Sequence, residues 1–214
     1  MREAAPGARE AHAPASRPSL GERRKTALRL EIAREAVRLF LAQGVTATTG
    51  DQIAQGVGVS TRTLWRHFPT KESCVLPLLA AGLDAVVELL RDWPPQTRLL
   101  DFLTTSCRQG RLPSADPAVL DLVRLTRTEP ALRAVWLQAH DDALPVLAGL
   151  LARRCGTSAD DLRVKVHAAT VNGALRTAAE DFAVRYADGP GASQEELTAC
   201  LHVALRAAVE GLPY

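Results

Sequence analysis

Four consecutive polar side chains, Ser60, Thr61, Arg62 and Thr63, carry groups that can recognise the edges of DNA bases. An arginine guanidinium can donate two hydrogen bonds to guanine, and a threonine offers a hydroxyl to acceptors and a methyl group to thymine. A helix in the major groove reads bases with its N-terminal residues, while its flanks meet phosphates. We therefore expect Thr61, Arg62 and Thr63 to read bases and Ser60 to contact the DNA backbone.

No comparable arrangement of residues predicts catalysis or metal binding. The chain has no Gly-rich phosphate loop and no Gly-x-Ser-x-Gly motif. Its adjacent carboxylates, Asp141-Asp142 and Asp160-Asp161, would point in different directions on a helix. The four cysteines stand singly, with neither a Cys-x-x-Cys pair nor a histidine at ligand spacing. The sequence thus predicts no enzyme, no metal site and no cofactor.

Short helices with clear start and stop signals are expected to hold the polar side chains in place. Ser19 with Glu22, and Thr49 with Gln52, form capping-box signatures, and Gly44 supplies a stop for the first helix. A tight turn at Gly58 leads into a third helix, which Ser60 caps and Pro69 ends. Two short helices joined by a tight turn behind a long amphipathic helix are the sequence form of a helix-turn-helix.

The string from Thr49 to Glu72 closely resembles the DNA-binding region of TetR-family repressors. The resemblance runs from about Glu31 to Val75. The positions that match the family pattern are Phe40, Gly44, Thr49, Ile53, Ala54, Gly58, Val59, Ser60, Leu64, His67, Phe68, Lys71 and Glu72.

The resemblance implies a dimeric repressor that binds a pseudo-palindromic operator and leaves it when a small molecule binds. In that family the residues at the positions of Thr49, Trp65, His67 and Lys71 touch the phosphate backbone, so these four are expected phosphate contacts. Trp65 stands where tyrosine is usual, and its indole keeps an N–H donor.

Composition divides the chain into three parts. Residues 1–18 are rich in Ala, Pro and Arg and predict a disordered arm, 19–70 a DNA-binding domain, and 71–214 a helical domain for ligand binding and dimerisation. Residues 1–75 carry 12 Lys/Arg against 7 Asp/Glu, whereas the remainder carries 14 against 17. The first third is therefore expected to face a polyanion.

Beyond residue 71 the periodicity predicts helices only. The expected segments, separated by proline and glycine signals, are about 71–92, 96–111, 115–127, 129–153, 158–187 and 193–211. The fold class is thus all-α with about nine helices. We find no uninterrupted apolar run of about 18 residues and no signal peptide, and we expect a cytoplasmic protein.

The last two segments are the expected homodimer interface, because the family pairs through its final long helices. Their small and branched apolar residues allow helices to approach closely in a four-helix arrangement. Those residues are Ala169, Gly173, Ala174, Leu197, Leu201, Ala204, Leu205 and Ala208. An alternative use of the same faces is to close the core of each subunit.

The resemblance also implies a ligand cavity among the middle helices, near Cys107. Trp136 and His140 lie four residues apart and share one helix face, as do Asn172 and Arg176, which could orient a polar or anionic group. An alternative use of these residues is as core and rim positions.

The stretch from Pro130 to Arg176 looks like the C-terminal domain of actinobacterial members that are thought to sense acyl-thioester-like molecules. A second possible function is a helical protein-interaction module with a vestigial DNA-binding head. The basic residues Arg62 and Arg66 on the third helix favour the repressor.

Overall fold

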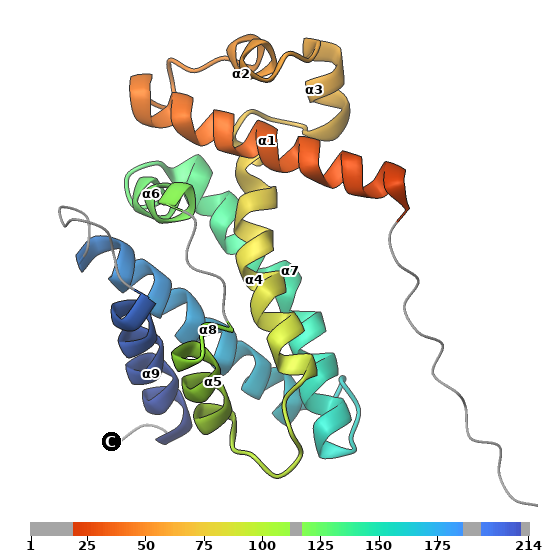
Figure 1. Ribbon diagram of the computed structural model, residues 1–214, viewed down its shortest axis with the longest axis vertical. Helices are drawn as coiled ribbons and strands as arrows, with labels where there is room; N and C mark the ends of the chain where they lie inside the picture. Colours follow the sequence, from red (N-terminus) through yellow and green to blue (C-terminus); the bar gives the residue numbers. More distant parts are fainter. Residues whose placement is uncertain (1–18, 112–116, 186–193, 211–214) are drawn as a thin grey trace, which may run out of the picture.

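The computed structural model describes residues 19–111, 117–185 and 194–210, which contain α-helices, one short 3-10 helix and no strand. The expectation of an all-α fold is therefore confirmed. The sequence-predicted arm, residues 1–18, lies outside the described residues. A head of three helices sits across one end of an elongated helical body (Figure 1).

The head consists of α1 (Leu20–Gln43), α2 (Gly50–Val57) and α3 (Thr61–His67). Both predicted capping boxes are present, since Ser19 and Glu22, and likewise Thr49 and Gln52, bond reciprocally through side chain and backbone. Gly58 ends α2 in the left-handed conformation, with φ of 74°, which a residue without a side chain adopts at little cost. These signals fix where the two short helices begin and end.

The body starts with a 3-10 turn, Glu72–Val75, that leads directly into α4. Its helices are α4 (Leu76–Arg91), α5 (Leu99–Arg108), α6 (Pro117–Leu125), α7 (Pro130–Cys155), α8 (Leu162–Arg185) and α9 (Gln194–Glu210). The segment Glu72–Arg91 is long and apolar enough by composition to cross a membrane. In the structure, however, α4 runs through the centre of the molecule and buries residues such as Leu79 and Leu90 against neighbouring helices (Figure 1).

Two of the predicted helix starts were wrong by a few residues. Helix α5 begins at Leu99 rather than near 96, because Arg154 donates hydrogen bonds to the carbonyls of Pro94, Pro95 and Thr97 and holds this stretch as a loop. Helix α8 begins at Leu162 rather than near 158, because Ser158 and Asp161 form a turn before it. Neither contact is visible in helical periodicity.

The hydrophobic interior forms two clusters. The first contains the underside of the head and parts of α4, α6 and α7, with Ile32, Phe68, Leu79, Leu122 and Trp136 among its buried members. The second fills the far half of the body between α4, α5, α7, α8 and α9. The head therefore shares the first cluster with α4, α6 and α7, and a displacement of α7 or α4 can reach it.

Candidate nucleic-acid interface and ligand cavity

Helix α3 is anchored on one side and exposed on the other. Leu64 and Phe68 are buried in the core, while the Ser60 hydroxyl accepts a hydrogen bond from the backbone N–H of Thr63 at 3.1 Å and caps the helix. Arg62 is exposed, and its guanidinium makes no hydrogen bond or ion pair within the described part of the chain. The N-terminal end of α3 thus presents a cation that the protein itself leaves available.

Two threonines at this surface also hold the helices together. The hydroxyl of Thr61 donates to the Asp51 carboxylate at 2.6 Å, which ties the start of α3 to α2. The hydroxyl of Thr49 caps α2 by accepting from the backbone N–H of Gln52 at 3.2 Å. Thr61 keeps its methyl group and its oxygen lone pairs for DNA. The Thr49 oxygen already accepts from Gln52, and its hydroxyl donates to Gln52 Oε1 at 3.3 Å, so a phosphate contact would take this hydrogen from Gln52.

The Trp65 ring lies against Gly50, the first residue of α2. Gly50 is buried beneath the indole, and a Cβ atom added to Gly50 would overlap Cζ2 and Cη2 of that ring. The tryptophan is nevertheless 43% exposed. Gly50 therefore provides the space in which the larger ring, in place of the family's usual tyrosine, can lie at the surface.

Lys71 faces the loop between α1 and α2. Its ammonium donates to the carbonyl oxygens of Val45 at 2.6 Å, Thr46 at 3.3 Å and Thr48 at 2.8 Å. These bonds use all three N–H donors of the side chain. A phosphate contact from Lys71, as the sequence predicts, would have to share or replace them.

Two basic side chains of α1 near the end of α3, Lys25 and Arg29, were not singled out from the sequence. Burial, with the nearby charges of Arg66, Lys25 and Arg29, lowers the pKa of His67 below its ordinary value. The Arg29 guanidinium lies 5.1 Å from the centroid of the Phe68 ring. Lys25 and Arg29 are one turn apart on α1, so this spacing was the available signal. Arg66, Lys25 and Arg29 thus form a positive flank around His67 beside α3.

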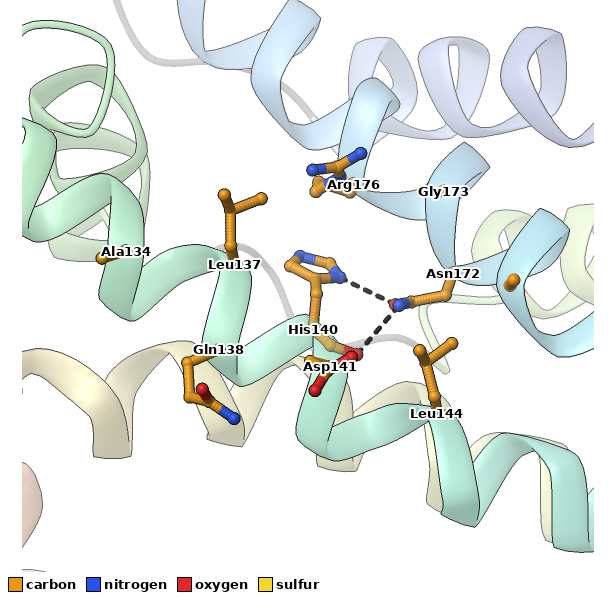
Figure 2. A pocket seen from close by; sticks show the side chains of 10 residues that line it. Ala134, Leu137, Gln138, His140, Asp141, Leu144, Asn172, Gly173 and Arg176 are labelled. Carbon is orange, nitrogen blue, oxygen red and sulfur yellow. Dashed lines mark hydrogen bonds between the residues drawn. The ribbon is translucent and has the colours of Figure 1, made fainter. Parts of the chain in front are cut away.

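Three of the predicted ligand residues meet in a cavity of about 460 Å³ between α7 and α8 (Figure 2). Its walls include His140 from α7 and Asn172, Gly173 and Arg176 from α8, and Leu137 and Leu144 supply apolar surface. The His140 Nδ1 atom lies 2.7 Å from Asn172 Oδ1, and Asn172 Nδ2 donates to the His140 carbonyl oxygen at 2.9 Å. The side chain of Cys107 lies outside what the structure describes.

Trp136, the fourth predicted ligand residue, supports this wall from behind. Its ring meets the His140 imidazole edge-on, with centroids 4.2 Å apart, and its indole N–H donates to the Glu180 carboxylate at 2.7 Å. Arg133 pairs with the same carboxylate. These bonds lower the pKa of Glu180 despite its partial burial, which acts in the opposite direction. Arg133 and Glu180 were missed because spacing along one helix does not reveal partners on another.

A second cavity of about 340 Å³ lies at the far end of the body. Its walls are mainly apolar and come from the α4–α5 loop and helices α5, α7, α8 and α9; they include Trp93, Leu99, Leu151, Val171 and Val209. The Arg154 guanidinium lies 3.5 Å from the centroid of the Trp93 ring and closes one side. This cavity could accept an apolar chain.

Comparisons with known proteins agree with this geometry. Residues 32–78 match the family model described as bacterial regulatory proteins, tetR family, and residues 110–213 match the MftR C-terminal domain. The transcriptional regulator TcmR of Streptomyces glaucescens is 34% identical over 152 residues, which cover 67% of each chain. The transcriptional repressor AcnR of Corynebacterium diphtheriae is 28% identical over 174 residues, covering 75% of this chain and 82% of that one.

Among solved structures, the fatty acid degradation regulator FadR from Bacillus halodurans superposes with a TM-score of 0.54 at 18% sequence identity, covering 87% of this chain and 97% of that one. At this identity the likeness shows the fold only. Together with the sequence relatives and the helix-turn-helix head, it identifies the chain as a member of the TetR family of bacterial transcriptional regulators.

Proposed function

We propose that this regulator is a repressor, which binds a pseudo-palindromic operator as a homodimer and is released by a small-molecule inducer. The observation that carries the proposal is the exposed N-terminal end of α3, where Arg62 is available beside Thr61 and Thr63 while the opposite face of the helix is buried. This is the arrangement that a major-groove reading helix requires. We expect the operator to be met in the cytoplasm.

The phosphate contacts are proposed for both flanks of the reading helix. Thr49, Ser60, Trp65 and His67 lie at or beside the ends of α2 and α3, as the family pattern requires. To these we add the positive flank formed by Lys25, Arg29 and Arg66 around His67, because clustered like charges are stabilised by a polyanion.

Dimerisation is proposed through α8 and α9, which pack on each other along their length. Several apolar side chains on these helices remain exposed in the single chain, including Val166 at 52% and Val203 at 68%. The residues expected from the sequence divide between two tasks: Leu205 is buried within the subunit, whereas Ala169 is exposed. A second subunit would cover the exposed set and position two heads for a two-fold operator.

The inducer is proposed to bind in the body, near His140, Asn172 and Arg176, with Trp136 as support. Trp136 belongs to the same core cluster as the underside of the head, so a ligand that shifts α7 has a packed route to α1. An acyl-thioester inducer stays a prediction, and the apolar cavity beside Trp93 is the place with walls suited to an acyl chain.

The test is selection of bound sequences from a random duplex pool by the purified protein, followed by titration of the selected duplex with the protein and with its Arg62→Ala variant. We expect a pseudo-palindrome, and we expect Arg62→Ala to lower operator affinity by about 1–3 kcal/mol while leaving affinity for random DNA nearly unchanged. Equal losses on both duplexes would remove Arg62 from base reading. Absence of any enriched sequence would instead favour the protein-interaction module.

A further inference from the structure

The cavity between α7 and α8 contains a hydrogen-bonding group that the protein does not satisfy. His140 is only 4% exposed, and its Nε2 atom is the one buried side-chain nitrogen or oxygen without a partner in the described parts of the chain. An unsatisfied buried polar atom costs roughly 1–3 kcal/mol, so it calls for an explanation. Figure 2 shows the imidazole extending from α7 toward Arg176, with one ring nitrogen on Asn172 and the other turned away.

The neighbouring amide determines which hydrogen-bonding role this nitrogen has. The Nδ2 group of Asn172 donates to the His140 carbonyl oxygen, and this bond fixes the orientation of the amide because a carbonyl cannot face another carbonyl favourably. Asn172 Oδ1 is therefore the atom 2.7 Å from His140 Nδ1, and it can only accept. Nδ1 must carry the hydrogen, which leaves a lone pair on Nε2 as long as the ring is neutral.

The ring is both neutral and held in place. Burial lowers the pKa of His140 below its usual value and outweighs the hydrogen bond to Asn172, which acts in the opposite direction, so the neutral imidazole is favoured near pH 7. Trp136 packs edge-on against the ring and is itself bonded to Glu180, so the ring cannot rotate without breaking that contact. Nε2 is thus a fixed acceptor.

Arg176 adds a cation to the same wall. It lies one helical turn after Asn172, and its guanidinium makes no hydrogen bond or ion pair within the described residues, although its charge contributes to lowering the pKa of Glu180. Gly173, which lies between Asn172 and Arg176 in the sequence of α8, leaves open space, since a Cβ built there would meet nothing within 4 Å. His140 and Arg176 both line this cavity, so a buried, fixed acceptor and an available cation lie at its wall.

We propose that the α7–α8 cavity is the site of a ligand that carries a hydroxyl donor for His140 Nε2 and an anionic or carbonyl oxygen for Arg176. The inference deepens the proposed function, since it rests on the regulator having a small-molecule effector. A ligand without the hydroxyl donor would leave Nε2 unsatisfied after binding. The site is therefore expected to distinguish ligands that carry this hydroxyl from analogues that lack it. Leu137 and Leu144 provide the apolar surface for the rest of such a molecule.

The experiment uses four probes with the full-length protein: 3- and 4-hydroxybenzoate and their methyl ethers, 3- and 4-methoxybenzoate. Each methyl ether keeps the carboxylate and loses the donor. Two-bond ¹H–¹⁵N correlation of the histidine rings, assigned with His140→Gln, reports which nitrogen carries hydrogen. The same titrations give the dissociation constants.

We expect free His140 to show a bare Nε2, whose resonance shifts when a hydroxybenzoate binds. The methyl ethers should bind at least about tenfold more weakly, and Arg176→Gln should weaken the hydroxybenzoates by a similar factor. Gly173→Leu should fill the cavity and abolish binding, whereas Gly82→Leu, at another helical glycine with open space around its Cβ position, should have no effect. Because Gly173 is also an expected dimer-interface residue, the mass of both variants is measured on the same samples and should equal that of the unchanged protein.

Three results would overturn the proposal: a protonated Nε2 in the free protein, equal binding of hydroxybenzoates and methyl ethers, or no binding by any of the four probes. Operator affinity is measured on the same samples. Normal operator binding without probe binding refutes this ligand site and leaves the regulator intact. Probe binding to a protein that selects no operator supports the site and refutes the proposed function.

Discussion

At the scale of single residues, Gly50 and Trp65 form a matched pair in the DNA-binding head. The indole occupies the space that any side chain at position 50 would need. Because Trp65 is partly exposed, it can move outward when displaced. The pair therefore controls where the ring lies relative to DNA more than it controls whether the head folds.

We predict that Gly50→Ala lowers operator affinity and reduces the free energy of unfolding by about 1 kcal/mol, at the low end for overpacking. In a Trp65→Ala background the same change should be neutral or stabilising by about 0.5–1 kcal/mol, because alanine favours the helix over glycine. Urea unfolding and operator titration of the four proteins complete a double-mutant cycle. Equal effects of Gly50→Ala in both backgrounds would show that the ring does not matter.

At the scale of elements, Lys71 connects the start of the body to the loop that precedes α2. Its three bonds to the carbonyls of residues 45, 46 and 48 join segments that are more than twenty residues apart. Since only the 3-10 turn Glu72–Val75 separates Lys71 from α4, movement of this helix would pull on the loop and on Thr49. The geometry favours a tie between elements over a phosphate contact.

Lys71→Ala is predicted to reduce the free energy of unfolding by about 1.5–3 kcal/mol, the range for hydrogen bonds to a charged group. It should weaken DNA binding without changing the slope of log affinity against log salt. Arg66→Ala is the matched control, because loss of a phosphate contact should reduce that slope by about 0.9 at nearly unchanged stability. A reduced slope for Lys71→Ala, with normal stability, would restore it as a phosphate contact.

How far the sequence could predict this structure differs between local and distant features. Capping signals at Ser19 and Thr49 and the turn at Gly58 act within four residues, so the head could be predicted nearly to the residue. Helical spacing likewise placed Trp136 with His140, and Asn172 with Arg176, on shared helix faces, and the family resemblance implied that both faces line one cavity. Periodicity tells which face of a helix is used but not which helix it meets, so the ties from Glu180 to Trp136 and from Arg154 to the α4–α5 loop were not foreseen.

At the scale of the whole molecule, the buried imidazole makes stability depend on pH. The pKa of His140 in the folded protein lies below the ordinary value of 6.5, so the unfolded chain binds more protons as the pH falls. Its stabilising contribution is therefore complete above about pH 6.5 and is lost as the pH drops toward the folded pKa. His67, whose pKa is also lowered, acts in the same direction.

We predict that the free energy of unfolding decreases between pH 7 and pH 5, with a slope of at most about 1.4 kcal/mol per pH unit for each fully linked proton. His140→Gln should flatten this dependence more than His67→Gln does, because His140 is the more deeply buried. Urea unfolding measures the pH dependence of the free energy of unfolding. The protein concentration is kept fixed, because the apparent stability of a dimer changes with concentration. An unchanged slope in His140→Gln would assign the proton uptake to other groups.

The proposed two-fold assembly would bury a surface of α9 that a single chain leaves exposed. Val203 on α9 is 68% exposed, so Val203→Glu should change the stability of an isolated subunit by no more than about 0.5 kcal/mol. In a dimer the same carboxylate would be buried without a partner, which costs several kcal/mol. We therefore expect monomers in a mass measurement and weaker operator binding, while Val146→Glu, at an exposed valine on α7, should leave both unchanged. A Val203→Glu protein that remains dimeric would place the interface elsewhere.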